Sequence, residues 1–412
     1  MNVAALRQQF PALNQSINNQ TPIFFDGPGG SQVPQSVLEA MNAYLGFYNS
    51  NLGGAFFSSD KTVALMQQAR QAVADLLNAP SSDQIVFGAN MTSLTFSFSR
   101  AISRDWQAGD EIIVTNADHF SNVSSWQLAA EDKGVTVNTA LINEADCTLD
   151  YAHFESLLNE KTKLVAVTYA SNTTGSINDI KRIVEAAHQV GALVYVDAVH
   201  FAPHELIDVQ ALNCDFLACS AYKFFGPHVG IVYGKREHLE GFTPYKVEPA
   251  KDVIPGRWET GTQSFEGLAG VIAAIDYIAS ISKLPSSESR RVRLVDALTI
   301  SKQHEMALSQ HFLARLAEFP QIKLFGINDV TRLAERTPTF ALTFADHSPN
   351  EVSRFLGQDA ICVWDGNFYA QGLCQQLGVL ETGGVVRIGC MHYNTVAEID
   401  RLFDKLNELI NR

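Results

Sequence analysis

Two apolar stretches of the chain, Ala192-Leu-Val-Tyr-Val-Asp197 and Asp215-Phe-Leu-Ala-Cys-Ser220, each end in a polar side chain. The second continues directly into Ala-Tyr-Lys223-Phe-Phe-Gly-Pro. Short, nearly continuous apolar runs are typical of strands buried on both faces of a parallel sheet. Because ligands bind at the carboxyl ends of such strands, the pattern predicts that Asp197 and Lys223 belong to one site at the edge of an α/β sheet.

The same alternation of strands and helices extends along the chain on both sides of this segment. Strands are predicted at 84–88, 111–115, 163–169, 192–197, 215–219 and 230–234, with helices between most of them. From about residue 264 long helices are followed by strands at 323–325, 339–344 and 385–389, which predict an antiparallel α+β domain. We expect an N-terminal arm at 1–20 packing on the small domain, a large α/β domain at 21–263 and this small domain at 264–412.

Composition excludes several classes of partner. The chain has 412 residues and a formal net charge of −14, which argues against nucleic acid and anionic membranes as partners. No apolar signal core opens the sequence, and Asp276 interrupts its longest apolar stretch. The six cysteines form no Cys-x-x-Cys pair, so reduced thiols in a cytoplasmic protein are expected, with neither a zinc ribbon nor a disulfide framework.

Lys223 and Asp197 together indicate a particular cofactor chemistry. A lysine amine can form a Schiff base with an aldehyde, and a carboxylate can keep a pyridine nitrogen protonated, as pyridoxal 5′-phosphate (PLP) requires. Taken singly, the lysine is explained as a solvated surface residue and the aspartate as a helix cap. Ser220-x-x-Lys223 also occurs in serine β-lactamases, but the companion Ser-Asp-Asn and Lys-Thr-Gly motifs are absent.

Three further strand ends carry polar or aromatic side chains. Asn90-Met91-Thr92 opens a helix, whose free N–H groups suit a phosphate, although Asn90 also fits a plain N-cap. His119 follows the next strand, where its ring is placed either to stack on a pyridine or to serve a structural role. The amide of Asn172 is able to donate to a phenolate oxygen or simply to shape its turn.

A metal site is the alternative for Asp197, His200 and His204. Two histidines at i and i+4 share one face only on a helix, and Pro203 between them disfavours a helix. We therefore expect no metal. A dinucleotide is unsupported as well, because no Gly-x-Gly-x-x-Gly follows the first strand.

At this point the chain resembles a known family, the class V aminotransferases of PLP fold type I, and most of all their cysteine desulfurase and selenocysteine lyase branch. The resemblance covers the chain from Phe24 to the C-terminus and implies a seven-stranded, mostly parallel sheet. It rests on these segments: Asp118-His119-x-x-Asn122, Ser171-Asn172-x-x-Gly175, Val196-Asp197-Ala-Val-His200, Ser220-Ala-Tyr-Lys223-x-x-Gly-Pro, Glu259-Thr-Gly-Thr262 and Arg387-Ile-Gly-x-x-x-Tyr393-Asn394-Thr395.

The resemblance implies a role for each matched position. The three catalytic residues would be Lys223, which binds the cofactor and moves the Cα proton, Asp197, which faces the pyridine nitrogen, and His119, which stacks on the ring. The remaining cofactor-binding residues would be Asn90, Met91, Thr92, Asn172, His200, Ser220, Tyr222 and, from the neighbouring subunit of a homodimer, Thr262. Arg387 would bind the substrate carboxylate, which suits its planar fork.

The chain departs from the desulfurase pattern at one loop. Where Arg-x-Gly-x-x-Cys-Ala is expected, it reads Trp364-Asp-Gly-Asn-Phe-Tyr369-Ala. Persulfide transfer needs a thiolate, which a phenol cannot replace. Cys374 lies in a stretch that reads as helix and is expected in the core, although it stays open as a substitute nucleophile. Trp364 and Tyr369 would then shape the substrate's side-chain pocket.

These residues predict a PLP enzyme acting at Cα of an amino acid, by β-elimination or by transamination. Three other classes stay open: an amino-acid epimerase, a non-catalytic PLP-binding partner in sulfur metabolism, and a desulfurase that uses another cysteine. The intact Lys223–Asp197 pair counts against the non-catalytic partner, because an interaction module has no use for either residue.

Overall fold

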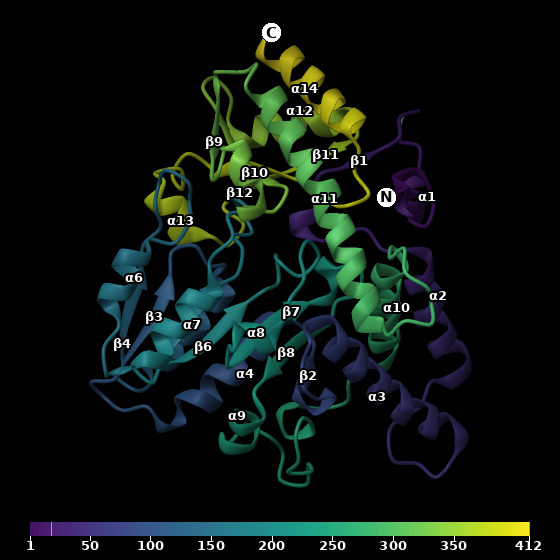
Figure 1. Cartoon of the computed structure of the whole chain (residues 1–412), viewed down its shortest axis with the longest axis vertical. Helices are drawn as coiled ribbons and strands as arrows, with labels where there is room; N and C mark the ends of the chain where they lie inside the picture. The colour runs from purple at the N-terminus through teal and green to yellow at the C-terminus, as the bar shows by residue number, and fades with distance from the viewer. Residues whose placement is uncertain (18, 412) are drawn as a thin grey trace.

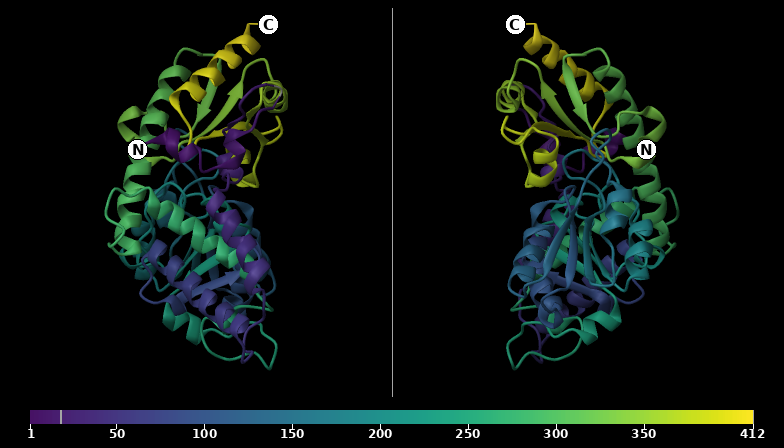
Figure 2. Two further views of the ribbon diagram at one scale, coloured as in Figure 1. Left: turned by 90° about the vertical axis from the view of Figure 1, so that its right-hand side faces the viewer. Right: turned by 90° about the vertical axis from the view of Figure 1, so that its left-hand side faces the viewer.

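The computed structural model describes residues 1–17 and 19–411, and in it a large sheet and a small sheet are stacked along the long axis (Figures 1 and 2). In sheet order the large sheet runs β2 (Ile85–Gly88), β8 (Gly230–Gly234), β7 (Phe216–Ser220), β6 (Leu193–Asp197), β5 (Thr162–Thr168), β3 (Glu111–Thr115) and β4 (Thr136–Ala140). Only β8 runs against its neighbours within this described sheet, so the expected mostly parallel, seven-stranded sheet is confirmed. The sequence pattern missed β4, which carries threonine and asparagine at an edge of the sheet.

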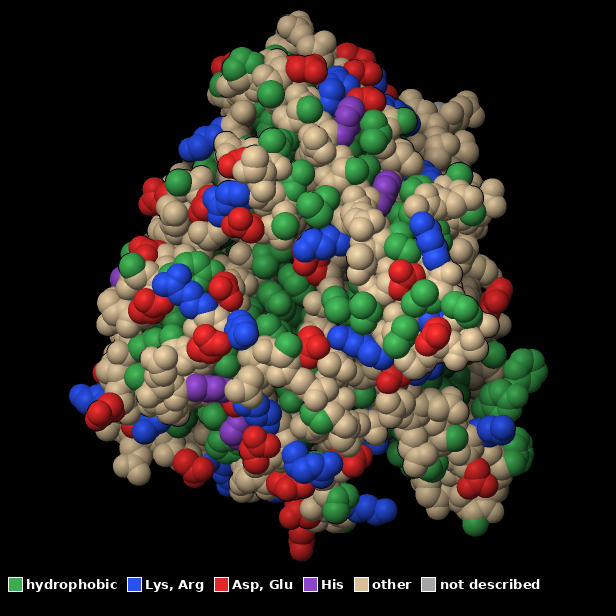
Figure 3. Space-filling view, viewed as in Figure 1, with side chains coloured by type: hydrophobic (Ala, Val, Ile, Leu, Met, Phe, Trp, Pro, Cys, Tyr) green, Lys and Arg blue, Asp and Glu red, His purple; other side chains and the backbone are tan. Residues whose placement is uncertain are grey.

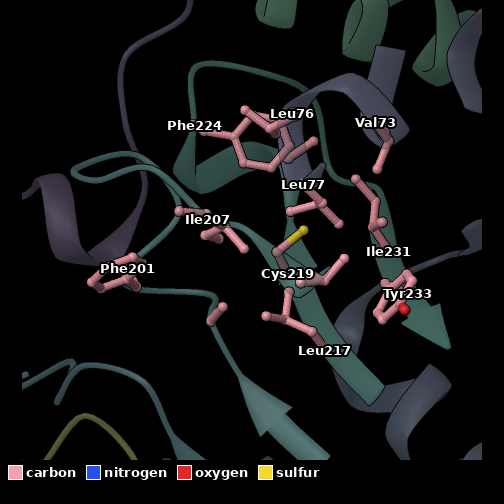
Figure 4. Packing of buried hydrophobic residues seen from close by; sticks show 14 of the residues in the cluster. Val73, Leu76, Leu77, Phe201, Ile207, Leu217, Cys219, Phe224, Ile231 and Tyr233 are labelled. Atoms are coloured by element: carbon pink, nitrogen blue, oxygen red, sulfur yellow. The ribbon is translucent and has the colours of Figure 1, made fainter. Parts of the chain in front are cut away.

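Helices cover both faces of the large sheet because successive side chains of a strand point to opposite faces. On β7, Leu217 and Cys219 face one side, where α3 packs on them, while Phe216 and Ala218 join the other core (Figure 4). The first face is covered by α3 (Phe57–Leu77), α6 (Tyr151–Leu157), α7 (Ile180–Gln189), α8 (Val209–Leu212) and α10 (Phe265–Ser280). The second is covered by α4 (Met91–Ile102), α5 (Ser124–Glu131) and α9 (Arg236–Gly241).

The small sheet is antiparallel, as expected, with the order β12 (Trp364–Gly366), β13 (Val385–Gly389), β10 (Thr339–Phe344) and β9 (Ile322–Phe325). Its helices are α11 (Arg290–Leu316), α12 (Pro349–Gln358), α13 (Gln371–Gln376) and α14 (Val396–Ile410). Phe312 of α11 stacks on Phe340 of β10 with ring centroids 3.7 Å apart, at the centre of the small domain's core.

Short elements join the two parts. The parallel pair β1 (Ile23–Phe24) and β11 (Ile361–Cys362) ties the chain after the arm to the small-domain core. The remaining helices are α1 (Val3–Arg7) and α2 (Gln35–Ala43). Short helical turns are η1 (Pro11–Asn14), η2 (Gly27–Gly29), η3 (Tyr44–Tyr48), η4 (Ser82–Gln84), η5 (Ser103–Asp105), η6 (Phe120–Asn122), η7 (Ala221–Lys223), η8 (Gly256–Trp258) and η9 (Val330–Glu335), the last of them kinked.

The arm contacts both α10 and the C-terminal part of the chain. Arg7 pairs with Glu398 of α14 at 2.8 Å, while Phe10 makes edge contacts with Tyr277 of α10 and with Tyr393. The apolar residues of α10 belong to the core of the large sheet, and α11 starts there before it reaches the small domain. The domain boundary at residue 264 stays a prediction. The first part of α11 packs in the core of the large sheet and its last part in the core of the small domain, so the two hydrophobic cores separate along this helix.

The amino end of β7 carries a buried carboxylate with four donors. Asp215 accepts hydrogen bonds from the Nε2 atoms of His188 and His238, each at 2.9 Å, from Lys235 Nζ at 3.0 Å and from the Val194 N–H at 2.8 Å. Burial raises the pKa of this carboxyl, but the hydrogen bonds from the two histidines and Val194 and the charge of Lys235 lower it well below its usual range.

We expect Asp215→Asn to lower the free energy of unfolding by about 3 kcal/mol at pH 7, because the donors lose their buried anion. The folded-state pKa is depressed, so this stabilisation is present above the unfolded pKa of about 3.9 and is lost as pH falls below it. Urea unfolding at pH 7 and at pH 3 measures the difference, with the exposed Asp132→Asn as the matched control. Equal losses for the two variants at pH 7 would contradict the prediction.

Candidate active site

Five loops at one edge of the large sheet enclose a cavity. β2, β3, β5, β6 and β7 all run in one direction, so their carboxyl ends meet at this edge, which faces the small domain. The cavity is lined by Asn90, Met91, Thr92, His119, Ser121, Thr168, Ala170, Asn172, Asp197, Val199, His200, Ser220, Tyr222 and Lys223. Ten of these were singled out from the sequence; Ser121, Thr168, Ala170 and Val199 were missed, since small and apolar lining residues carry no chemical signal of their own.

Lys223 and Asp197 face this cavity from neighbouring strands. Lys223 is 8% exposed, and its Nζ donates to the Pro28 carbonyl in the loop around η2. Burial, assisted by the charge of Arg387, lowers the pKa of Lys223 to about 7, which keeps much of its amine neutral at neutral pH. Asp197 accepts from the Val199 N–H at 2.9 Å, and burial raises its pKa to about 6. A nucleophilic amine therefore coexists with a carboxylate near pH 7.

The N-terminus of α4 supplies free backbone donors to the cavity. Asn90 is the N-cap, and its Oδ1 accepts from the Ser93 N–H at 2.8 Å, which leaves the N–H groups of Met91 and Thr92 directed out of the helix. Together with the positive end of the helix dipole, these groups suit an anion. Asn90 is therefore both an N-cap and part of the anion site, because its capping bond to Ser93 leaves the N–H groups of Met91 and Thr92 free for a ligand.

His119 lies over the cavity in its neutral form. Burial, with the charges of Lys223 and Arg387, lowers its pKa to about 4, and its Nδ1 accepts from the Ser121 N–H at 3.1 Å. The loop below is held by a buried chain in which Trp126 donates to Asn122 at 3.0 Å and Asn122 donates to Asp118 at 2.8 Å. Burial raises the pKa of Asp118 to about 8, so this carboxyl is protonated at neutral pH.

Asn172 and His200 form the wall of the cavity nearest the small domain. The Nε2 of His200 lies 3.1 Å from the hydroxyls of both Thr337 and Thr339, which leaves Nδ1 as the ring nitrogen free for a group in the cavity. The pKa of His200 lies well below its usual value, chiefly through burial, so the ring is neutral. Asn172 Oδ1 is buried and has no hydrogen-bond partner within the described part of the chain.

Arg387 lies behind this wall and does not line the cavity. It is 4% exposed on β13, where Trp364 of β12 is its cross-strand partner. Trp364 packs its indole against Gly29, and Tyr369 is 71% exposed with its ring centroid 5.2 Å from that of His119. Neither Trp364 nor Tyr369 is among the residues that line the cavity. The neighbouring Phe368, which the sequence did not single out, lies against Arg387.

Thr262 lines two other hollows of this chain, one of them shared with Leu52. Its expected action on the cofactor of a neighbouring subunit stays a prediction.

No group of histidine, cysteine, aspartate and glutamate side chains suited to a metal ion is found among residues 1–17 and 19–411. His204 instead pairs with Glu305 of α11 at 2.9 Å, fully buried. Cys374 is fully buried in the core beneath α13, as expected, and burial raises the pKa of its thiol to about 11.

Comparison with known proteins identifies the family. The sequence profile described as Aminotransferase class-V matches residues 23–402. The chain belongs to this family. A class V relative from Halalkalibacterium halodurans, a "probable cysteine desulfurase", is 32% identical over 98% of this chain and 96% of its own, and a "cysteine desulfurase" from Dickeya dadantii has the same values.

Solved class V structures share the fold over the whole chain. The apo cysteine desulfurase from Thermococcus onnurineus superposes with a TM-score of 0.88 at 25% identity, covering 99% of this chain and 98% of that one. The cysteine desulfurase CsdA from Escherichia coli gives 0.85 at 27% identity, covering 100% and 99%. The fold type I architecture expected from the sequence is confirmed, and the protein is a PLP-dependent enzyme.

The residues of the cavity fit this cofactor. A deprotonatable lysine, a carboxylate, a helix N-terminus and the orphaned Asn172 Oδ1 lie around one space. Their chemistry matches the aldehyde, the pyridine nitrogen, the phosphate and the phenolic hydroxyl of PLP.

Proposed function

We propose that this class V enzyme acts at Cα of an amino acid by β-elimination or transamination, without the persulfide chemistry of a desulfurase. The observation that carries the proposal is the cavity in which Lys223, with its pKa lowered to about 7, faces Asp197. When bound, PLP withdraws electrons from Cα and so makes its proton acidic.

In this proposal each residue has a defined task. Asp197 holds a proton on the pyridine nitrogen, and His119 covers the ring. Lys223 binds the aldehyde carbon, and its freed amine moves the proton at Cα. The N–H groups of α4, with Ser220 and Tyr222, hold the phosphate. Arg387 binds the substrate carboxylate.

Tyr369 supports the exclusion of desulfurase chemistry. Its side chain is at the mouth of the site, where the resemblance to desulfurases expects the nucleophilic cysteine. The thiol of Cys374 has no access to solvent, and its raised pKa disfavours the thiolate. Trp364 in place of an arginine favours a substrate with a single carboxylate or with an apolar or aromatic side chain. An epimerase on the same site and a non-catalytic PLP-binding protein are the alternatives.

The test is a visible absorption spectrum of the purified holoenzyme titrated with single L-amino acids, cysteine and cystine included. We expect one class of amino acid to change the cofactor band. Product analysis then identifies the reaction. Elimination yields a keto acid and ammonia, transamination yields a keto acid and an aminated cofactor, and epimerisation yields a racemised amino acid. A band that no amino acid changes would support the non-catalytic alternative, and persulfide on the protein would support a desulfurase.

We also propose a homodimer. Large apolar side chains are exposed along η3 and the start of α3, including Phe47 at 74%, Phe56 at 54% and Phe57 at 71%. Hydrophobic atoms gather on the projecting corner over the α2–α3 connection (Figure 3), an arrangement that marks a partner surface. Thr262 and Leu52 line one groove beside this apolar surface. Dimerisation through the surface would bring Thr262 to the cavity of the partner subunit. Sedimentation as a monomer at working concentration would contradict this.

No helix within the described residues has the length and apolar character needed to span a membrane.

A further inference from the structure

Three contacts join Phe368, Asn172 and Arg387 in a closed circuit beside the cavity. Arg387 Nη1 donates to the Asn172 carbonyl at 2.9 Å, and Asn172 Nδ2 donates to the Phe368 carbonyl at 3.0 Å. The Phe368 ring closes the circuit, because the guanidinium carbon of Arg387 lies 3.9 Å from its centroid. Each residue thus touches the other two, and Asn172 also lines the cavity.

The circuit fixes the guanidinium through stacking and a single hydrogen bond from Nη1. Stacking on Phe368 sets the plane of the group, and the Nη1 bond sets its rotation within that plane. Arg387 Nε is buried without a hydrogen-bond partner in the described chain, and a buried donor left in this state is unfavourable until a ligand accepts from it. The buried carboxyl of Asp26 is near enough to act electrostatically on Arg387, but no salt bridge or hydrogen bond joins the two within residues 1–17 and 19–411. A planar guanidinium held in this way is prepared for a ligand carboxylate.

The backbone holds Phe368 in place at some cost. Phe368 and Tyr369 have φ values of +52° and +58°, in the left-handed region that residues other than glycine rarely adopt. Such residues persist only where their surroundings hold them. Here the Tyr369 carbonyl accepts from the Phe120 N–H at 2.8 Å, and the Tyr369 N–H donates to Asn367 Oδ1 at 3.0 Å.

We propose that Phe368 is a positioning residue for the substrate: its aromatic face, acting through Arg387, orients the guanidinium that binds the substrate carboxylate. This rests on the proposed function of Arg387 and adds a residue to it. The aromatic face is essential because the ring quadrupole attracts a cation, and an aliphatic side chain of similar size offers packing alone.

The test compares Phe368→Leu with Phe368→Tyr in the holoenzyme. With the best amino-acid substrate we expect Phe368→Leu to raise KM by about fivefold to thirtyfold with kcat nearly unchanged. Phe368→Tyr restores a KM within about twofold of wild type, since it keeps the ring. Phe344→Leu, the same change at the far end of β10, is the matched control and leaves KM unchanged. Equal KM values for Phe368→Leu and wild type would overturn the proposal.

A second measurement separates this proposal from the proposed function. Propionate has a carboxylate and no amine, so its binding, measured by calorimetry on the holoenzyme, requires Arg387 and no reaction. Phe368→Leu is expected to weaken it about as much as it raises KM, and to have no effect once Arg387→Gln is present. Propionate binding that depends on Phe368 in a protein inert to amino acids would uphold the positioning role and refute the activity. Binding weakened equally by Phe368→Leu and Phe368→Tyr would overturn the positioning role.

Discussion

Lys223→Ala is expected to abolish covalent attachment of PLP and to lower turnover of any amino acid by at least about 10³-fold. The variant loses both the amine that binds the aldehyde carbon and the base that moves the Cα proton, and a positioned base alone contributes about 10²–10⁴-fold. We expect no other lysine to substitute, because burial lowers the pKa of Lys223 to about 7 whereas solvated amines stay protonated near neutral pH.

Mass spectrometry after borohydride reduction measures this loss directly, because reduction fixes the cofactor on the lysine that carries it. Wild type is expected to gain one cofactor mass at Lys223, and the variant none. Lys283→Ala, an exposed lysine beyond α10, is the matched control and retains the label. Covalent cofactor on Lys223→Ala, or full turnover without it, would contradict the assignment.

In the cofactor-free protein, the role of Lys223 also predicts how the capture of PLP depends on pH. The rate at which it captures PLP is expected to rise with pH through about 7 and then level off, because only the neutral amine of Lys223 is nucleophilic. An unperturbed lysine would show this rise near pH 10.4 instead. Stopped-flow absorbance between pH 5.5 and 9 distinguishes the two.

The large sheet could be predicted because its inner strands are uniformly apolar and end in polar residues. β6 and β7 were placed within one residue of their observed bounds, and Asp197 and Lys223 came with them. β4 was missed because threonine and asparagine at a sheet edge give neither an apolar run nor a clean alternation. A long helix was expected from about residue 264, where α10 begins, but sequence periodicity does not say which core a helix covers. The apolar face of α10 joins the core of the large sheet.

The site divides in the same way. Residues at strand ends were found because topology alone brings them together. Phe368 was not found, because its importance depends on a left-handed turn that places its ring against Arg387. The two residues of this turn with positive φ, Phe368 and Tyr369, are not glycines, so the sequence did not indicate the conformation. The exposed Tyr369 looked more significant because it occupies the position of a missing cysteine. The threonines that hold His200 come from the other domain, which no local pattern reveals.

Asp197→Asn is expected to lower turnover by about 10²–10³-fold while covalent attachment through Lys223 persists. A neutral amide cannot hold a proton on the pyridine nitrogen, so the bound cofactor loses the positive charge that makes the Cα proton acidic. Asp118→Asn is the matched control, because burial raises the pKa of Asp118 to about 8 and a protonated carboxyl and an amide both carry no charge.

The pH profile of the two variants decides whether charge at Asp197 is the cause. Burial raises the pKa of Asp197 to about 6 in the cofactor-free protein, and the positive pyridine nitrogen of bound PLP lowers that pKa again. The wild-type carboxylate of the holoenzyme therefore takes up a proton only below about pH 6, and turnover is expected to fall with it. Asp197→Asn has no such group and should lose this limb of the profile, whereas Asp118→Asn should keep it with less than about a tenfold loss at pH 7, where the Asp118 carboxyl is mostly protonated. If Asp118→Asn were as damaged as Asp197→Asn and both profiles kept the limb, the loss would reflect packing at the carboxyl ends of the strands, and the proton on the pyridine nitrogen would need another acceptor than Asp197.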